Sequence, residues 1–241
     1  MTRRPPRQPT PPAPGAELLK AGASATQPDV WKLPADRLQP DRVWKTFRES
    51  PAPLRATVCR WIAQREGRNL QHLQGLPGVP EFLGFPEPWT VEMTWLSAEP
   101  VPETKTGHGL GRDYFDELDR LIRAIHARGL NHGDLRRRNL MRHARTGAPV
   151  LVDFAQSLAF PPQRQGWIGR RVFLHAAHVD RLTFLKLKRW YLGETALSAE
   201  ESEELAAQPA SLRFGRLLKK GVYRRYKHWR QGKVRKDKTK L

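Results

Sequence analysis

Alternating apolar and polar positions predict two strands in the first hundred residues. In residues 42–47 every second side chain points to the same side, so Val43, Lys45 and Phe47 share one face. A lysine therefore lies between two apolar neighbours on that face. Residues 91–96 show a second strand pattern, and a loop rich in proline and glycine follows it.

Between these strands the apolar spacing changes to that of an amphipathic helix. The apolar positions are Leu54, Val58, Ile62, Leu70 and Leu73. Glu66 falls on this stripe where an apolar residue is expected, and its side chain is buried or exposed according to the phase of the helix. Gly67 weakens the helix directly after Glu66, so we expect its continuity to be poorest there.

A third periodic segment, residues 113–128, gives the clearest helix of the chain. Its apolar face is formed by Leu118, Leu121, Ile122 and Ile125. Gly129 follows directly, where a glycine commonly ends a helix. The segment after this glycine is the part of the chain richest in polar side chains that can take part in catalysis or bind ligands.

A β-hairpin is predicted shortly after this helix. Residues 140–143 and 150–154 resemble two strands joined by a short loop. Symmetric antiparallel pairing about that loop sets Leu140 opposite Asp153. Asn139 and Asp153 should therefore be close neighbours at one end of the hairpin.

Asp134 lies five residues before Asn139, on the loop that enters the hairpin. An amide and two carboxylates thus converge, and these are oxygen ligands suited to Mg²⁺ together with phosphate groups. Taken singly, Asp134 and Asn139 could cap turns, and Asp153 could be an ordinary residue at a strand end. Their joint spacing favours a site for a nucleotide and a metal ion.

The spacing of these residues resembles that of the protein-kinase-like superfamily. The H-x-D-x-x-x-x-N motif beginning at His132, and the Asp-Phe pair beginning at Asp153, resemble the kinase catalytic loop and metal-binding segment. Upstream, Lys45 on a strand and Glu66 on the next helix follow the same order. The resemblance covers roughly residues 40–160.

The resemblance implies a role for each of these residues. Asp134 would be the catalytic base or orient the acceptor hydroxyl, and Asn139 and Asp153 would hold Mg²⁺. Lys45 would contact the α- and β-phosphates of ATP while pairing with Glu66.

Neighbouring residues would support the same chemistry. Arg136 occupies the position where many kinases have a lysine facing the transferred phosphate, although Arg138 could take that role instead. His132 would brace the loop by hydrogen bonds and would not act as a base. Asp180 could anchor the catalytic loop from the following helix, or be a plain surface acid.

Several features depart from the common kinase pattern. Ala155 follows the Asp-Phe pair where most protein kinases have glycine, and this restricts the backbone. No glycine-rich loop precedes Lys45, and the glycines of residues 107–111 follow no strand directly, so we interpret them as a flexible connection. Such a reduced chain is similar to the small atypical branch: lipopolysaccharide core sugar kinases, RIO-type kinases and predicted bacterial serine/threonine kinases.

Composition narrows the class of protein further. The 241 residues carry 43 Lys+Arg against 24 Asp+Glu, a net charge of +19. No stretch approaches the roughly 18 consecutive apolar residues of a spanning helix, and no apolar segment of an export signal follows the start. The single cysteine excludes an internal disulfide. We therefore expect a cytoplasmic protein.

Most of the excess charge lies at the C-terminal end. Residues 213–241 hold 13 Lys+Arg and one acid, a net of +12. Apolar residues recur every three or four positions between residues 213 and 230, which predicts a basic amphipathic helix. This helix could pack on the catalytic domain, lie on an anionic membrane, or bind RNA, which is less favoured.

Together these patterns predict an α+β protein with a minimal two-lobed protein-kinase-like fold. A disordered Pro/Arg-rich arm (1–27) would precede a small β-rich N-lobe (28–96), a mainly helical C-lobe (97–212) and the basic tail (213–241). The expected function is Mg²⁺-dependent transfer of the γ-phosphate of ATP to a hydroxyl of a protein Ser/Thr or a lipopolysaccharide core sugar. The alternative is a pseudokinase that binds partners without chemistry.

Overall fold

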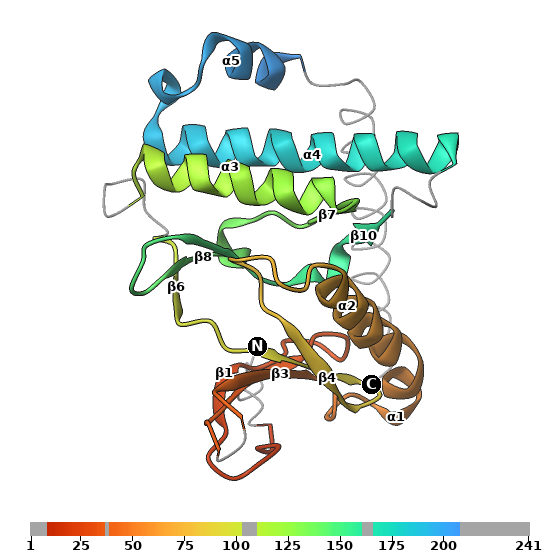
Figure 1. Ribbon diagram of the computed structural model, residues 1–241. Coiled ribbons are helices and arrows are strands. Elements are labelled where there is room, and N and C mark those ends of the chain that lie inside the picture. Colours follow the sequence, from red (N-terminus) through yellow and green to blue (C-terminus); the bar gives the residue numbers. More distant parts are fainter. Residues whose placement is uncertain (1–8, 37–38, 103–109, 161–165, 208–241) are drawn as a thin grey trace, which may run out of the picture. The chain divides into compact units, whose positions relative to one another are not determined.

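The computed structural model describes residues 9–36, 39–102, 110–160 and 166–207 (Figure 1). The chain divides into two compact units after Ala196. The first unit combines a β-rich N-terminal part with a mainly helical part, which confirms the predicted α+β architecture.

The N-terminal part is built on a five-stranded antiparallel sheet with the order β1-β2-β3-β5-β4. The strands are β1 (Glu17–Lys20), β2 (Asp29–Leu33), β3 (Arg42–Thr46), β4 (Phe82–Glu87) and β5 (Thr90–Thr94). The predicted strands at 42–47 and 91–96 correspond to β3 and β5. Val43 and Lys45 are both buried, as the alternation of β3 predicts.

Strand β1 corrects the prediction that residues 1–27 form a disordered arm. Residues 17–20 pair antiparallel with β2, with Leu18 opposite Trp31. All four residues of β1 are exposed, so backbone pairing rather than burial holds the strand in place. The apolar pattern of the sequence therefore carried no signal for it.

One helical segment follows β3. It consists of α1 (Ala52–Leu54), a π-helical turn η1 (Arg55–Cys59) and α2 (Arg60–His72). The helix continues through Gly67, where its continuity was expected to be poorest. A Cβ at Gly67 would clash with the ring of Phe85 and lie 2.9 Å from the ring of Phe82. Close packing of these rings from β4 therefore explains why glycine stands inside the helix.

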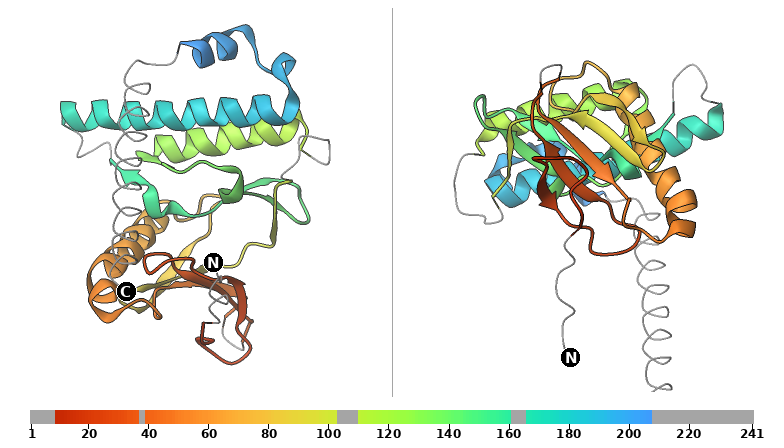
Figure 2. Two further views of the ribbon diagram at one scale, coloured as in Figure 1. Left: turned by 180° about the vertical axis from the view of Figure 1, so that it is seen from behind. Right: turned by 90° about the horizontal axis from the view of Figure 1, so that it is seen from below.

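Two antiparallel helices dominate the second part of this unit, α3 (Arg112–Ala127) and α4 (Trp167–Leu192), and they lie side by side in Figures 1 and 2. Phe115 and Phe184 pack between them, with ring centroids 6.4 Å apart. Short strands connect these helices to the rest of the unit: β6 (Ala98–Pro100), β7 (Leu130–Asn131), β8 (Leu140–His143), β9 (Pro149–Leu151) and β10 (Leu158–Ala159). They form the sheets β6-β8-β9 and β10-β7.

The β8–β9 hairpin forms as predicted, but its register differs by two residues. Leu140 lies opposite Leu151 and not opposite Asp153. The turn closes early, because the N–H of His143 donates to the carbonyl of Ala148 at 2.8 Å. A shift of two residues keeps every side chain on its predicted face. Asp153 consequently lies beyond the end of β9, where its backbone is left-handed with φ 73°.

The second unit begins inside the range 97–212 that was predicted as one helical lobe. Helix α4 ends at Gly193, whose φ of +87° is unfavourable for other residues. Within the second unit, α5 (Ala199–Ala206) begins with a capping box between Ser198 and Glu201. The predicted tail helix lies outside the described residues. In the described part of the chain, no helix has the length and apolar character needed to cross a membrane.

Candidate active site

Lys45 joins two carboxylates from distant parts of the chain. Its Nζ lies 2.6 Å from Oε1 of Glu66 on α2 and 2.9 Å from Oδ1 of Asp153, just after β9. Glu66 is buried, so it faces inward on the helix as its place on the apolar stripe suggested. The structure thus brings together three of the six predicted site residues.

The charges of this triad are mutually dependent. Burial by itself lowers the pKa of Lys45, but the carboxylates of Glu66 and Asp153 outweigh it and hold the pKa above the ordinary lysine value. The Lys45 ammonium in turn holds the pKa of Asp153 below its usual range. At neutral pH a permanent cation therefore faces an ionised Asp153.

The catalytic loop is fixed by a carboxylate on α4. Asp180 is buried, and its two oxygens accept the backbone N–H groups of His132 at 2.6 Å and Gly133 at 3.0 Å. Asp180 therefore anchors the catalytic loop and is not a plain surface acid. Gly133 has φ +76°, and a Cβ there would lie 2.7 Å from the carbonyl oxygen of Gln156. Only glycine fits this position without moving the backbone.

His132 braces the loop internally. Its Nε2 lies 3.2 Å from the carbonyl oxygen of Val152, and its Nδ1 accepts the N–H of Asp134 at 3.3 Å. Burial lowers the pKa of His132 and so favours the neutral imidazole. These contacts agree with a bracing role and leave no ring nitrogen directed at a substrate.

Asp134 is surrounded by groups that orient its carboxylate. Arg136 forms an ion pair with Oδ1 through its Nε, and Nη2 of Arg138 lies 3.5 Å from Oδ2. The side-chain amide of Asn139 donates to the Asp134 carbonyl at 2.9 Å and to Oδ2 at 3.3 Å. Both arginines considered for the phosphate-facing role therefore contact the same carboxylate.

Asn139 and Asp153, the two predicted ligands of Mg²⁺, lie just outside the two strands of the β8–β9 hairpin, and they offer an amide oxygen and a carboxylate, which are ligand types that suit this ion. The N–H of Val152 donates to the Asn139 carbonyl at 3.0 Å, which holds the two segments together where β8 and β9 begin and end. The side-chain bonds of Asn139 to Asp134 are made by its Nδ2. The described residues hold no group of three or more His, Cys, Asp or Glu side chains able to bind a metal. A metal here would need phosphate oxygens or water to complete its ligands.

Side chains of α2 also donate hydrogen bonds to the segment after Asp153, and the sequence analysis did not identify these residues. Asn69 donates from Nδ2 to the carbonyls of Phe154 at 2.9 Å and Ser157 at 3.1 Å. Arg65 donates to the carbonyl of Ala155. Asn69 lies three residues after Glu66, on the same face of the helix, which is the spacing that could have identified it.

A second feature that the sequence did not suggest is the connection between β1 and β2. Residues 21–28 form a loop in which the N–H of Gly22 donates to Oδ1 of Asp29 at 2.8 Å. Lys20, at the end of β1, contributes to lowering the pKa of Asp153. Val30 of β2 lies opposite Lys45 of β3, so this hairpin adjoins the strand that carries the lysine. The loop between β1 and β2 is rich in small residues and has no glycine-rich motif, and these small residues are the sequence feature that could have indicated it.

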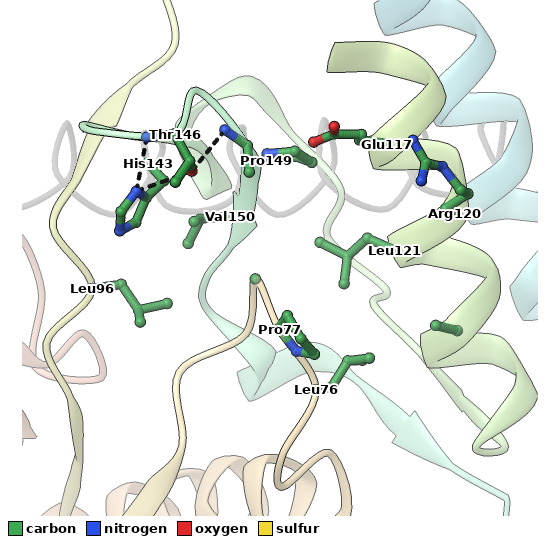
Figure 3. Close-up of a pocket in the computed structure, with 13 residues that line it drawn as sticks. Leu76, Pro77, Leu96, Glu117, Arg120, Leu121, His143, Thr146, Pro149 and Val150 are labelled. Carbon is green, nitrogen blue, oxygen red and sulfur yellow. Dashed lines mark hydrogen bonds between the residues drawn. The ribbon is translucent and has the colours of Figure 1, made fainter. Parts of the chain in front are cut away.

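A cavity of about 470 Å³ lies elsewhere in the unit (Figure 3). Its walls come from α3, the β8–β9 hairpin, the loop before β4 and the segment between β5 and β6: Leu76, Leu96, Leu121, His143 and Val150 are among the lining residues. None of the six predicted site residues lines it. The candidate site is thus defined by its polar side chains and not by this cavity.

Fold and site together define an atypical member of the protein-kinase-like superfamily. Residues 42–167, just over half of the chain, match the model of the RIO domain, and the chain belongs to the RIO domain family. No curated protein matches the chain.

Solved structures similar to this chain include two of the Rio2 kinase from Chaetomium thermophilum. The ADP/Mg²⁺-phosphoaspartate complex is 18% identical over 78% of this chain and 68% of that chain, with a TM-score of 0.45. The other structure is 17% identical over 81% of this chain and 71% of that chain, with a TM-score of 0.47.

Proposed function

We propose that the protein is a phosphotransferase that moves the γ-phosphate of ATP to a hydroxyl group. The observation that carries the proposal is the position of Lys45, which bridges Glu66 and Asp153 at 2.6 and 2.9 Å. This arrangement holds an ammonium group beside the residues suited to Mg²⁺ and phosphate. Membership of the RIO domain family supports the same reaction class.

Each side chain has a separate task in this proposal. Lys45 binds the α- and β-phosphates, and Glu66 holds the ammonium in position. Asn139 and Asp153 hold Mg²⁺, which neutralises phosphate charge when it is bound.

Asp134 would orient the acceptor and take its proton. The acceptor oxygen forms a bond to the γ-phosphorus, the bond from that phosphorus to the bridging oxygen breaks, and ADP leaves. The acceptor proton passes to the Asp134 carboxylate. Arg136 would hold this carboxylate in place through the ion pair and stabilise charge on the transferred group.

The acceptor is proposed as a protein Ser/Thr side chain or a lipopolysaccharide core sugar. Both are hydroxyl groups, so the same catalytic residues serve either. We place the protein in the cytoplasm, with peripheral membrane attachment through the basic tail if the acceptor is lipid-linked, and with RNA as the less favoured partner of that tail. Radiolabelled ATP supplied to separate lipid and protein fractions of host cells distinguishes the two acceptors.

The residue-level test compares two aspartates. Asp134→Asn should lower the rate of phosphate transfer by about 10²- to 10⁴-fold and spare ATP binding. Asp119→Asn, which changes an acid paired with Arg123 on α3, is the matched control. Binding is measured as the shift in melting temperature with Mg²⁺ and ATP. Retained transfer by Asp134→Asn contradicts the role of Asp134.

The alternative function is a pseudokinase that binds a nucleotide or partner without transferring phosphate. Two observations favour it: Asp134 is already contacted by both Arg136 and Arg138, and Ala155 replaces the usual glycine. ATP binding without any phosphate transfer, in either cell fraction, supports this alternative. A wild-type protein that transfers phosphate excludes it.

A further inference from the structure

The N-terminal half of α4 exposes large apolar side chains. This half projects past the end of α3 in Figures 1 and 2. Four of its apolar side chains are exposed to 72%, 58%, 44% and 55%: Trp167, Ile168, Val172 and Leu174. Exposed apolar residues gathered on one element mark a contact surface far more often than single ones do. We call these four residues the α4 patch.

The other side of the same helix is packed. Phe173 contacts the rings of His126 and Phe160, with centroids 6.3 and 6.2 Å away, and Asp180 further along is buried. With 100° per residue, Phe173, Ala176 and Asp180 lie on one side of the helix, and the patch residues lie on the remaining arc. The helix is therefore held in place by its inner side, while the four patch side chains on the other arc are exposed.

The charged Lys, Arg, Asp and Glu residues on this half of α4 have a single sign. Residues 160–179 contain no Asp or Glu and three arginines. Two of them, Arg170 and Arg171, are exposed on α4, and the Arg171 guanidinium lies 5.8 Å from the centre of the Trp167 ring. Exposed Trp, Ile, Val and Leu beside arginines are typical of helices that lie in the headgroup region of anionic membranes.

We propose that the α4 patch is a docking surface for an anionic lipid bilayer. The apolar side chains would enter the boundary between headgroups and acyl chains, and Arg170 and Arg171 would contact lipid phosphates. An isologous contact with a second copy fits less well, because it would bring arginines together without an acidic partner on this half of the helix. The proposal does not depend on phosphate transfer, and it differs from the attachment suggested for residues 213–241.

The first experiment measures flotation of the full chain with vesicles. Wild-type protein should bind vesicles of phosphatidylglycerol and phosphatidylcholine far more strongly than vesicles of phosphatidylcholine alone. The four-serine variant, which carries Trp167→Ser, Ile168→Ser, Val172→Ser and Leu174→Ser, should have a partition coefficient about tenfold or more below that of the wild type. The assay is repeated in 0.5 M salt, which screens a contribution of the basic tail more than apolar insertion.

A matched variant and a spectroscopic readout complete the test. Val58→Ser with Trp61→Ser removes two exposed apolar side chains from η1 and α2, and it should bind vesicles like the wild type. Brominated lipids should quench tryptophan fluorescence in the wild type. Trp167→Phe should retain binding and lose most of the quenching.

Four results overturn the proposal. They are absence of wild-type binding to anionic vesicles, equal binding by the four-serine variant, quenching that Trp167→Phe leaves unchanged, and a change of oligomeric state caused by the serines. The last result would instead identify a second copy as the occupant. Circular dichroism checks that the four-serine variant is folded. If that variant does not fold, the Trp167→Phe experiment still tests the proposal.

Discussion

The carboxylate of Asp180 accepts the backbone N–H of His132 at 2.6 Å, across 48 residues of sequence. The same group accepts the N–H of Gly133 and lies 3.2 Å from Nε2 of His126. One buried acid on α4 thereby fixes the loop that carries Asp134. Positioning of the predicted catalytic residue depends on this contact between helix and loop.

Replacing Asp180 should therefore destabilise the protein and disturb the loop. Asp180→Asn should lower the free energy of unfolding by about 3 kcal/mol, because two backbone donors lose a charged acceptor. Asp119→Asn, which breaks partly exposed ion pairs with Arg123 and Arg181, should cost under about 1 kcal/mol. Urea unfolding measures both values. Equal losses in the two variants would show that the loop does not depend on Asp180.

The Lys45–Glu66 pair should behave as one energetic unit. Lys45→Met leaves a buried carboxylate without its cation and should destabilise the fold by about 3–5 kcal/mol. The variant carrying both Lys45→Met and Glu66→Gln should lose less stability than the sum of the single variants, because no buried Glu66 carboxylate is then left without its cation. A double-mutant cycle by urea unfolding gives this coupling. Additive losses would contradict a direct interaction.

The stability contributed by Asp153 should depend on pH on the acid side. Its pKa is lowered in the folded protein, chiefly by Lys45, so the unfolded chain takes up this proton first as the pH falls. The stabilisation is complete above the ordinary pKa of 3.8 and disappears as the pH falls through the lower, folded value. Wild type should exceed Asp153→Asn in urea midpoint at pH 6, with a smaller difference at pH 3. A difference that stays constant between these pH values refutes the linkage.

Gly67 should resist replacement despite its position inside α2. Gly67→Ala gains about 1 kcal/mol of helix propensity, but its methyl group would overlap the ring of Phe85. Overpacking of this kind costs about 1–3 kcal/mol, so we expect net destabilisation or no gain. Gln71→Ala, at an exposed position of the same helix, is the control and should change little. Thermal unfolding of both variants measures these changes in stability. A clearly stabilised Gly67→Ala variant would contradict the packing argument.

Local pattern was sufficient for the elements that carry the site. The alternation around Lys45, the stripe through Glu66 and the helix over 113–128 each match an element of the structure. These predictions succeeded because a buried face imposes a regular spacing on the residues that form it. Register was less certain: the predicted hairpin was shifted by two residues, since the turn closes through His143 and Ala148.

The residues that sequence reasoning missed act through contacts between distant segments. Asn69 reaches carbonyls 85 and 88 residues away, and β1 is held by backbone pairing that has no apolar signature. Neither property is visible in a local spacing. The exposure of the α4 patch is likewise not visible in a local spacing. Apolar side chains in a helix pattern predict burial, and only the structure shows that α4 projects past the end of α3.

The amino-acid sequence alone determined which residue types are available and in which order: a strand lysine, a helix acid, and the spaced Asp134, Asn139 and Asp153. Tertiary structure alone decided that Lys45 meets Glu66 and Asp153, that Asp180 holds the loop, and that the side chains of the α4 patch are exposed. The physical reason is that spacing along the chain fixes the direction of a side chain only within its own element. Which element it meets is set by the packing of the whole unit.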